Sequence, residues 1–552
     1  MLIKVGIFLL IMTTGCYADV NTITVDTTLG AIKGIEMETR FGNKFWSFRG
    51  IRYVEPPLGE LRFQNPQPIK AWKPEVLDAT SDGPLCPQVT EHMDMLAEDC
   101  LHLNIYTKSL NSDQPLKPVI VFIHPGGFHG GTGISVLMGP RYFMERDIVL
   151  VTFNYRLASL GFLAINTAQA TGNMGLKDQV MVLRWIRDHI EKFGGDSNSV
   201  TLWGYSAGSL SVGLHMLSPM SKGLFHRAIM QSASPLGHFR YDNNQMELAE
   251  KQAKLLECPT APVADMVKCL KEKPMMDYVK TSTDMFESNW NPIYNWFPVV
   301  EADFGQERFL TEDPYKTMMS GNINKVPLMI GLAEYELYFF AHHTLLNEEQ
   351  RQHFIDEFDK YAPIYFMYER SGPMSANISQ QLGAYYLQGN PIEFPKSVEK
   401  FAEVYSDSLI CFANHRFLQM IAEHVPVYNY LFNYKGRYNY FKLDEALGAM
   451  HLDELLYFFN SPLLTPTFTA GDPENDTIER LTRLWYEFAK KGDPNNPSDD
   501  YLKNIQWPLH SSNNMEYLQI DEDVNVKMNG IFSDRMKFWE TLFPLQEVIG
   551  KF

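Results

Sequence analysis

The chain has 552 residues, of which 45% are hydrophobic, and this composition allows a large buried core. Neither its composition nor any internal repeat indicates a disordered or solenoid protein. A formal net charge of −18 argues against nucleic acid as a partner, because contacts with phosphates require clustered Lys and Arg. No linker rich in Gly, Ser or Pro divides the chain, so residues 19–552 are predicted to form a single domain.

The N-terminus has the pattern of a secretory signal. Lys4 precedes the apolar run 5–12, and small and polar residues follow as far as Ala18. Residues 1–18 are therefore predicted to be a cleaved signal, with a buried first strand as the alternative. No other run approaches the roughly 20 apolar residues of a membrane span, and the C-terminus carries no retention or lipid-anchor signal. We expect a secreted, extracellular protein without stable membrane insertion.

The cysteines fit an extracellular protein, because Cys16 would leave with the signal. The five that remain are two close pairs and a single residue: Cys86 with Cys100, Cys258 with Cys269, and Cys411. Each pair would close a short loop of the size that disulfides staple in secreted proteins. A metal site is the weaker alternative, since no pair has Cys-x-x-Cys spacing or a nearby His. The unpaired cysteine is expected to be buried and inert.

Two tripeptides match the acceptor for N-linked glycans. They begin at Asn377 and at Asn475. Such tripeptides also occur by chance, so both residues are only candidates on a secretory route.

The apolar pattern changes along the first third of the chain. Residues 21–25 and 30–34 alternate as in a β-hairpin, whereas 48–63, with its paired prolines, is expected to be an ordered surface loop. Residues 119–123 and 148–153 are nearly continuous apolar runs rich in β-branched side chains. Such runs are typical of strands buried on both faces, as in a parallel sheet covered by helices.

Helices and strands alternate from there on. Residues 178–193 have apolar side chains at helical spacing, and Gly194 and Gly195 end that helix. Further strands are predicted at 200–205, 227–230, 326–330 and 427–432, with a helix at 207–217. This α/β pattern predicts a mostly parallel sheet with right-handed crossovers.

The region 336–425 is helical in composition and rich in aromatic residues. It is too long for an ordinary loop, so we expect a helical cap over the functional site. For most of its aromatic side chains a plain core position is the simpler interpretation.

The strand at 200–205 ends in the motif Gly-x-Ser-x-Gly, which contains Ser206. In this motif the serine lies on a sharp turn from strand to helix, and Gly204 and Gly208 lack the Cβ atoms that would clash there. A serine hydroxyl needs a base to become a nucleophile and an acid to orient that base. In chains with this motif the acid follows the serine and the histidine follows the acid. Seven histidines come late enough to be the base: His342, His343, His353, His415, His424, His451 and His510.

Several motifs, in order, resemble the type-B carboxylesterases, the family that includes secreted insect esterases and cholinesterases. They lie at 48–63, 98–104, 154–162, 172–179, 204–208 and 225–232, and the resemblance covers nearly the whole mature chain. It implies an α/β-hydrolase fold, in which helices flank a central, mostly parallel mixed sheet and a helical cap region is added. It also implies hydrolysis of a carboxylic ester without a cofactor or a metal.

The resemblance further implies a catalytic triad. Ser206 matches the nucleophile, His451 matches the base within the segment 448–457, and Glu336 matches the acid. Glu334 is the alternative acid, but Glu336 has the better offset from the preceding strand. Leu337 stands where the family usually has glycine.

The same resemblance indicates which groups would stabilise an oxyanion. The donors would be the backbone N–H groups of Gly126 and Gly127, in a Gly-rich loop after a strand, and of Ala207, next to the serine. Pro125 replaces the first glycine of that loop, which is not among the family's donors. Ser232 matches a serine that supports the acid from behind.

Three alternatives narrow the function further. One is a catalytically inactive adhesion or binding relative on the same fold, but such relatives usually lose a triad residue, and all three positions are filled here. A cholinesterase would carry a Trp between Cys86 and Cys100 and a Glu before the serine, whereas this chain has no Trp there and has Tyr205. Juvenile hormone esterases typically carry Gln at that position. The expected partner is a small to medium apolar ester, such as a xenobiotic, odorant or hormone ester, and the sequence leaves the oligomeric state open.

Overall fold

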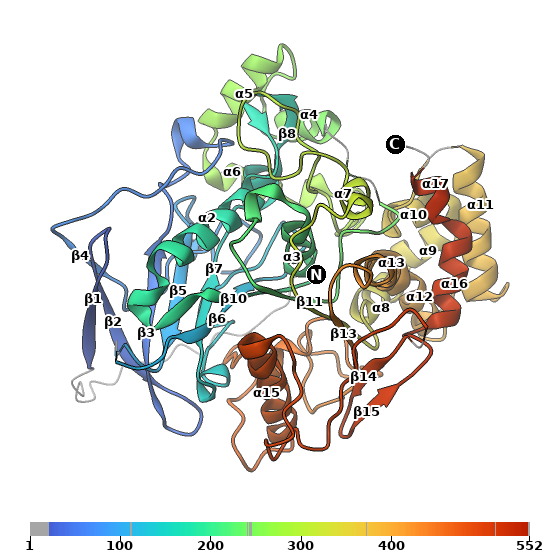
Figure 1. Cartoon of the computed structure of the whole chain (residues 1–552). Helices are drawn as coiled ribbons and strands as arrows, with labels where there is room; N and C mark the ends of the chain where they lie inside the picture. The colour runs from blue at the N-terminus through green and yellow to red at the C-terminus, as the bar shows by residue number, and fades with distance from the viewer. Residues whose placement is uncertain are drawn as a thin grey trace.

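The computed structural model describes residues 21–110, 113–239, 241, 245–370, 372–513 and 515–549. The predicted signal at 1–18 lies outside them. The described residues form one large sheet with helices on both faces (Figure 1). Along the sheet the strands follow the order β1 (Thr22–Asp26), β2 (Ala31–Glu38), β3 (Lys44–Arg52), β5 (His102–Thr107), β7 (Val149–Phe153), β6 (Lys117–Ile123), β10 (Gly195–Tyr205), β11 (Arg227–Gln231), β12 (Leu328–Ala333), β13 (Val427–Phe432), β14 (Tyr517–Ile520) and β15 (Val524–Lys527), while β4 (Val76–Asp78) pairs with β2.

The sheet is mixed, and its centre is parallel. Every neighbouring pair from β7 to β14 is parallel, whereas the strands from β1 to β7 and the pair β14 and β15 are antiparallel. A separate small ribbon pairs β8 (Ala164–Thr167) with β9 (Ala170–Thr171). This is the α/β-hydrolase architecture that the sequence predicts.

The helices are α1 (Ala158–Phe162), α2 (Met174–His189), α3 (Ala207–Leu217), α4 (Met246–Leu255), α5 (Val263–Glu272), α6 (Met275–Thr281), α7 (Pro314–Ser320), α8 (Tyr338–Leu346), α9 (Glu348–Asp356), α10 (Phe358–Tyr365), α11 (Pro373–Leu382), α12 (Val398–Ser406), α13 (Phe412–Ile421), α14 (Leu455–Phe458), α15 (Asn475–Lys491), α16 (Ser533–Leu542) and α17 (Leu545–Ile549). The helix predicted at 178–193 begins earlier, at Met174, and ends in a 3₁₀ turn before Gly194, whose φ of +78° suits glycine.

The central strands are buried on both faces, as their apolar runs predict. In β6, Val119 and Val121 pack into the core that contains α2 and α3, while Ile120 and Phe122 pack into the core that contains α15. Figure 1 shows these helices on opposite sides of the sheet. These two cores fix the positions of the central strands, and the Gly-rich loop and the Ser206 turn follow the ends of β6 and β10.

The segment 48–63 differs from its expected form. Phe48–Arg52 completes β3 and pairs with β5, so Phe48 and Ile51 are fully buried. The paired prolines exclude a strand only at their own positions, and a 3₁₀ turn at Gly59–Leu61 follows them. The expectation of a surface loop was therefore wrong for the first residues of the segment.

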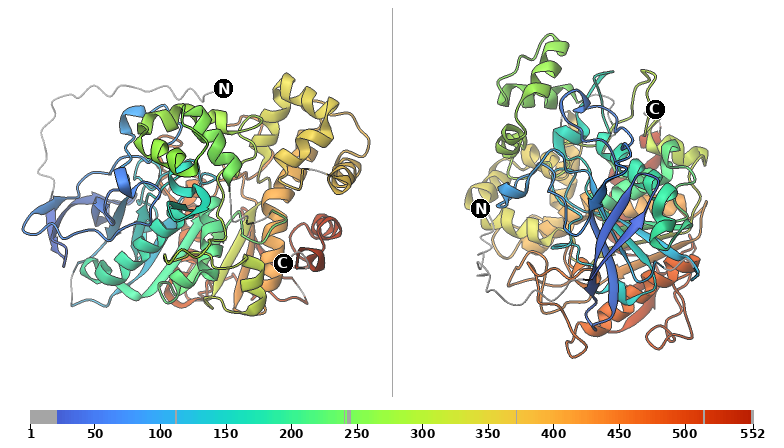
Figure 2. Two further views of the ribbon diagram at one scale, coloured as in Figure 1. Left: turned by 90° about the horizontal axis from the view of Figure 1, so that it is seen from above. Right: turned by 90° about the vertical axis from the view of Figure 1, so that its left-hand side faces the viewer.

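The region 336–425 is helical, as expected, and contains α8 to α13 with two π-helical turns at Gly383–Leu387 and Asp407–Cys411. Most of its aromatic side chains, such as Tyr365 and Phe366, are core residues. They pack with one another and with α16, and Figure 2 shows these helices gathered at one side of the molecule.

Candidate active site

Ser206 occupies a turn that only a narrow set of residues allows. It lies between β10 and α3 with a φ of +55°, a strained value for a residue with a side chain. A Cβ at Gly204 would overlap the backbone oxygen of Gly208, and one at Gly208 would overlap that of Ile123 in β6. The clash predicted from the motif is confirmed, and both glycines let strand and helix approach closely enough to present Ser206 at the sheet edge.

Glu336 and His451 lie in direct contact. The Nδ1 atom of His451 is 2.6 Å from Oε2 of Glu336, and the backbone N–H of His451 donates to the Glu336 carbonyl at 2.9 Å. The other carboxylate oxygen accepts from Ala333 N at 2.8 Å. Glu336 is 0% exposed, so water does not compete for its carboxylate. Since Nδ1 faces the acid, Nε2 of the neutral ring is the nitrogen that can accept a proton.

Glu334, the alternative acid, does not share this contact. Its carboxyl interacts with the side chain of Asn433, and burial raises its pKa. The structure brings Glu336, and not Glu334, to the histidine.

The Gly-rich loop lies beside the serine turn because β6 and β10 are parallel neighbours that end together, with Ile123 opposite Gly204. Gly126 has a φ of +129°, and a Cβ there would overlap the backbone oxygen of Gly130. Gly127, at +59°, also adopts a conformation that favours glycine. Ala207 is buried as the first residue of α3, where backbone N–H groups have no partner within the helix.

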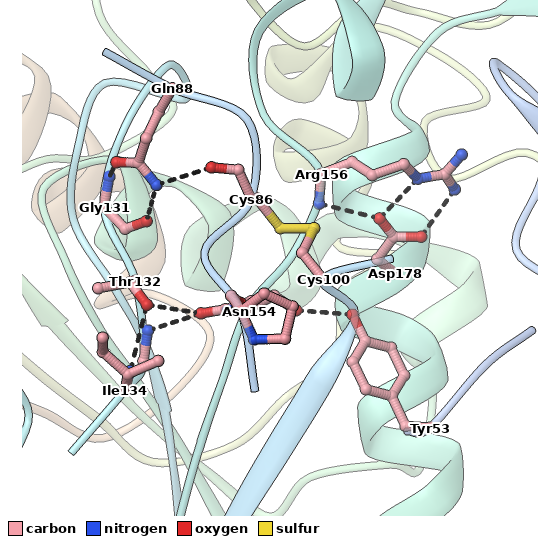
Figure 3. The surroundings of a disulfide bond; sticks show 12 residues. Tyr53, Cys86, Gln88, Cys100, Gly131, Thr132, Ile134, Asn154, Arg156 and Asp178 are labelled. Carbon is pink, nitrogen blue, oxygen red and sulfur yellow. Dashed lines mark hydrogen bonds and ion pairs between the residues drawn. A yellow bond between two sulfur atoms is a disulfide. The ribbon is translucent and has the colours of Figure 1, made fainter. Parts of the chain in front are cut away.

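The first disulfide loop braces this Gly-rich loop. The amide of Gln88 accepts from Gly131 N at 2.8 Å and donates to Gly131 O at 2.9 Å, two residues after Cys86 (Figure 3). Cys86 is joined to Cys100, and the side chain of Asn154 ties the next turn of the loop to the strand end. The disulfide and the Gly-rich loop are thus one packed unit.

The second predicted pair, Cys258 and Cys269, is also joined, and Cys411 is free and buried. Of the glycan candidates, Asn377 is exposed on α11, whereas Asn475 begins α15 and is only partly exposed. In the described ranges, no group of three or more His, Cys, Asp or Glu side chains is placed to hold a metal. None of the helices in those ranges is both long and apolar enough to cross a bilayer.

The expected support of Glu336 by Ser232 takes a different form. The Ser232 hydroxyl donates to the Tyr205 hydroxyl at 3.0 Å, not to the acid. Tyr205 is fully buried. Its ring packs against the His451 ring in a T-shaped arrangement, with a distance of 5.2 Å between the ring centroids. Ser232 is therefore linked to His451 through Tyr205.

A second buried carboxyl group lies three residues after His451. Glu454 accepts from the Tyr430 hydroxyl at 2.8 Å and from the Gln231 amide at 3.0 Å. Burial, reinforced by the charge of Glu336, raises the pKa of Glu454 to about 8, so this group is largely neutral at pH 7. It lies within the segment that identifies the histidine, but sequence alone does not show that its carboxyl is buried.

A cavity of about 330 Å³ opens beside the Gly-rich loop, and Gly126 and Leu452 are among the residues that line it. Its walls are mostly apolar and include Leu137, Met138, Met285, Phe286, Trp290 and Trp296. The density of aromatic residues from 286 to 297 is the sequence signal for this wall. His129 also lines the cavity, and burial lowers its pKa to about 4, which keeps the ring neutral.

The residues that line this cavity include none from 338–421. The helical region 336–425 therefore contributes no wall to this cavity. The aromatic side chains of α8 to α13 pack in their own core. The cavity is lined instead by α6 and the segment 285–296 on one side, and by residues 87–89, 125–138 and 157–160.

Comparison with known proteins agrees with this geometry. The chain matches the carboxylesterase family over residues 21–539. It is 33% identical to the juvenile hormone esterase of Tribolium castaneum over 93% of each chain, and 32% identical to venom carboxylesterase-6 of Apis mellifera over 96% of each. The crystal structure of juvenile hormone esterase from Manduca sexta, with OTFP covalently attached, superimposes with a TM-score of 0.83 at 28% identity, covering 95% of this chain and all of that one. The chain therefore belongs to the carboxylesterase family and is a serine carboxylesterase.

Proposed function

We propose that this protein hydrolyses small to medium apolar carboxylic esters with Ser206 as nucleophile, His451 as base and Glu336 as acid. The contact of 2.6 Å between His451 and Glu336, at the sheet edge where the Ser206 turn also lies, carries this proposal. Parallel strands end at one edge of the sheet, so residues far apart in the sequence meet there.

The proposed reaction follows from these positions. Ser206 attacks the ester carbonyl while Nε2 of His451 takes its proton, and Glu336 stabilises the imidazolium that forms. The N–H groups of Gly126, Gly127 and Ala207 stabilise the oxyanion. His451 then protonates the leaving alcohol, and water releases the acid from the acyl-enzyme by the same steps.

The cavity supports an apolar substrate. A volume of about 330 Å³ lies at the lower end of the range typical of small-molecule pockets. Its apolar walls favour binding of the hydrocarbon part of a substrate, because binding removes that part from water. They offer few charged partners to a charged substrate. The names of the relatives describe those proteins, and the substrate of this chain is to be found by comparing kcat/KM over short-chain, long-chain and terpenoid esters.

Secretion is part of the same proposal. Residues 1–18 would direct export, and the two disulfides fit an oxidising compartment. The exposed Asn377 is the better glycan acceptor, and Asn475 the poorer. Expression in insect cells should place the protein in the medium without residues 1–18, with a mass that falls on glycosidase treatment.

The Ser206→Ala variant tests the nucleophile. Hydrolysis of p-nitrophenyl acetate should fall by at least 10³-fold, since triad residues act as a unit. The wild type should be labelled once by diisopropyl fluorophosphate, at Ser206. As a control, Ser209→Ala removes a hydroxyl on the same helix that donates to Ala233 O, and it should remain active. Hydrolysis at the wild-type rate by Ser206→Ala would overturn the assignment.

A further inference from the structure

The hydroxyl of Tyr205 connects three segments that meet behind the triad. Tyr205 ends β10 directly before Ser206, and its oxygen accepts from Ser232 Oγ, just after β11, and from the backbone N–H of Leu452, both at 3.0 Å. Leu452 directly follows His451 in the chain. The phenol thus joins the strand that carries the serine to the loop that carries the histidine.

The backbone at Leu452 needs such an anchor. Its φ of +75° lies in the left-handed region, which is unfavourable for a residue with a branched side chain. The bond from its N–H to Tyr205 stabilises this conformation. On the other side, the N–H of His451 is held by the Glu336 carbonyl at 2.9 Å. Two successive amides therefore fix the plane from which the imidazole projects.

A buried carboxyl group lies beside this network. Tyr430 and Gln231 both donate to one oxygen of Glu454, and its other oxygen has no hydrogen-bond partner among the described residues. Burial and the charge of Glu336 favour the neutral form of Glu454, so a second negative charge does not compete with Glu336 for the imidazolium. The Tyr205 oxygen itself is held by the two hydrogen bonds from Ser232 and Leu452.

We propose that Tyr205 is a positioning residue that sets the location of His451 relative to Ser206. The inference depends on the proposed roles of these two residues. The rigid ring of a tyrosine is joined to its backbone by only two torsions. A Tyr205 hydroxyl anchored at Leu452 therefore fixes the distance between Ser206, which follows Tyr205, and His451, which precedes Leu452. Displacement of a catalytic group by about 1 Å can cost on the order of 100-fold in rate.

The Tyr205→Phe variant tests this role because it removes the hydroxyl and keeps the ring against His451. We expect kcat for p-nitrophenyl acetate to fall about 10-fold or more and KM to change much less, because Leu452 is the one cavity-lining residue that loses a hydrogen bond to Tyr205. The rate of labelling by diisopropyl fluorophosphate should fall in parallel. An unchanged kcat would overturn the inference.

Tyr368→Phe is the matched control. The Tyr368 hydroxyl is also buried and lies 2.7 Å from Ser379 Oγ, within the helical region 336–425, and Tyr368 does not line the cavity. Both variants should lower Tm by a similar amount, and only Tyr205→Phe should lower kcat. Equal loss of kcat in both would show a general effect of losing a buried bond and would overturn the positioning role.

A double-mutant cycle keeps the test decisive if Tyr205→Phe is poorly stable. Ser232→Ala should lower kcat by a smaller factor, and adding it to Tyr205→Phe should cause little further loss, because Ser232 acts through the phenol. Fully additive losses would contradict this. A dead Ser206→Ala variant together with a fully active Tyr205→Phe variant would refute the role of Tyr205 alone, whereas an active Ser206→Ala variant would refute the proposed function.

Discussion

Backbone space, more than side-chain chemistry, determines whether Ser206 can stand where it does. Its strained φ persists because β6, β10 and α3 are packed too closely for any alternative. The atoms that exclude a Cβ at Gly208 are backbone atoms of Ile123 and His124, which cannot move aside as a flexible side chain would. A methyl group at this position must therefore displace the strand or the helix.

Gly208→Ala should thus lower kcat/KM for p-nitrophenyl acetate by more than about 100-fold and destabilise the protein by more than about 2 kcal/mol. Gly383→Ala is the control, because Gly383 has nothing within 4 Å of the added Cβ. That variant should keep full activity and equal or slightly higher Tm. Comparable damage from both substitutions would contradict this steric explanation.

The buried Glu454 makes stability depend on pH. Its pKa is raised from an ordinary value of 4.5 to about 8 in the folded chain, so the folded state holds a proton that the unfolded state has lost between these values. The stabilisation is complete below about pH 4.5 and is lost as the pH rises through 8.

Glu454→Gln, which cannot ionise but keeps the hydrogen-bonding shape, should therefore show a smaller fall in Tm between pH 5 and pH 8 than the wild type. The two proteins should differ on the order of 2 to 4 kcal/mol in the change of their free energy of unfolding over this pH range, since each pKa unit corresponds to about 1.4 kcal/mol. As a control, Glu349→Gln replaces an exposed carboxyl group and should show the same fall in Tm between pH 5 and pH 8 as the wild type. Identical pH profiles for Glu454→Gln and wild type would show that Glu454 is not the group responsible.

At the scale of elements, the sequence predicts what depends on local pattern. The apolar runs of β6 and β7, the helix before Gly194 and the turn at Ser206 all appear where expected, because each is set by neighbouring residues. It fails where distant pairing decides. Phe48 and Ile51 become strand because β5 supplies the hydrogen bonds, and the partner of Tyr205 is 247 residues further along the chain.

The wall formed by 285–296 was missed for the same reason, since apolar residues in a loop do not show which cavity they face. Trp290, 38% exposed, stacks on His129 at 6.0 Å at the edge of the cavity. Trp290→Ala should raise KM for a long-chain apolar ester by about 5-fold to 30-fold, corresponding to roughly 1 to 2 kcal/mol of lost apolar contact, and leave p-nitrophenyl acetate nearly unchanged.

Phe304→Ala provides the comparison, because Phe304 is a similarly exposed aromatic residue that does not line the cavity. Neither substrate should respond to it. If Trp290→Ala affected both esters equally, the wall would not be the site of chain-length selection.

For the whole molecule, the two disulfides close loops of similar size but support different parts. Cys86 and Cys100 are 14 residues apart beside the Gly-rich loop, whereas Cys258 and Cys269 are 11 apart in the excursion that contains α5. Chain entropy assigns about 3 kcal/mol to a cross-link that closes a loop of this size. Similar losses of stability are thus expected from two bonds with different consequences for catalysis.

Replacing both members of either pair by Ser should lower Tm by a comparable amount. Only the variant without Cys86 and Cys100 should also have a lower kcat for p-nitrophenyl acetate when it is assayed at a temperature well below its Tm. The reason is that Gln88 then holds Gly131 less firmly. Equal kcat in both variants at 25 °C would show that this brace does not support catalysis.

The origin of the cavity wall has a consequence for how such a chain can change. Ser206, Glu336 and His451 follow strands of the sheet, whereas one side of the apolar wall comes from α6 and the segment 285–296, in which Tyr278, Met285 and Trp296 also belong to the core that contains α2 and α3. Phe286 and Trp290 line the cavity without being members of that core, so an exchange at these positions would alter which esters fit with little cost to folding. Substrate range and folding can therefore diverge at these positions, whereas changes at Met285 or Trp296 would alter both.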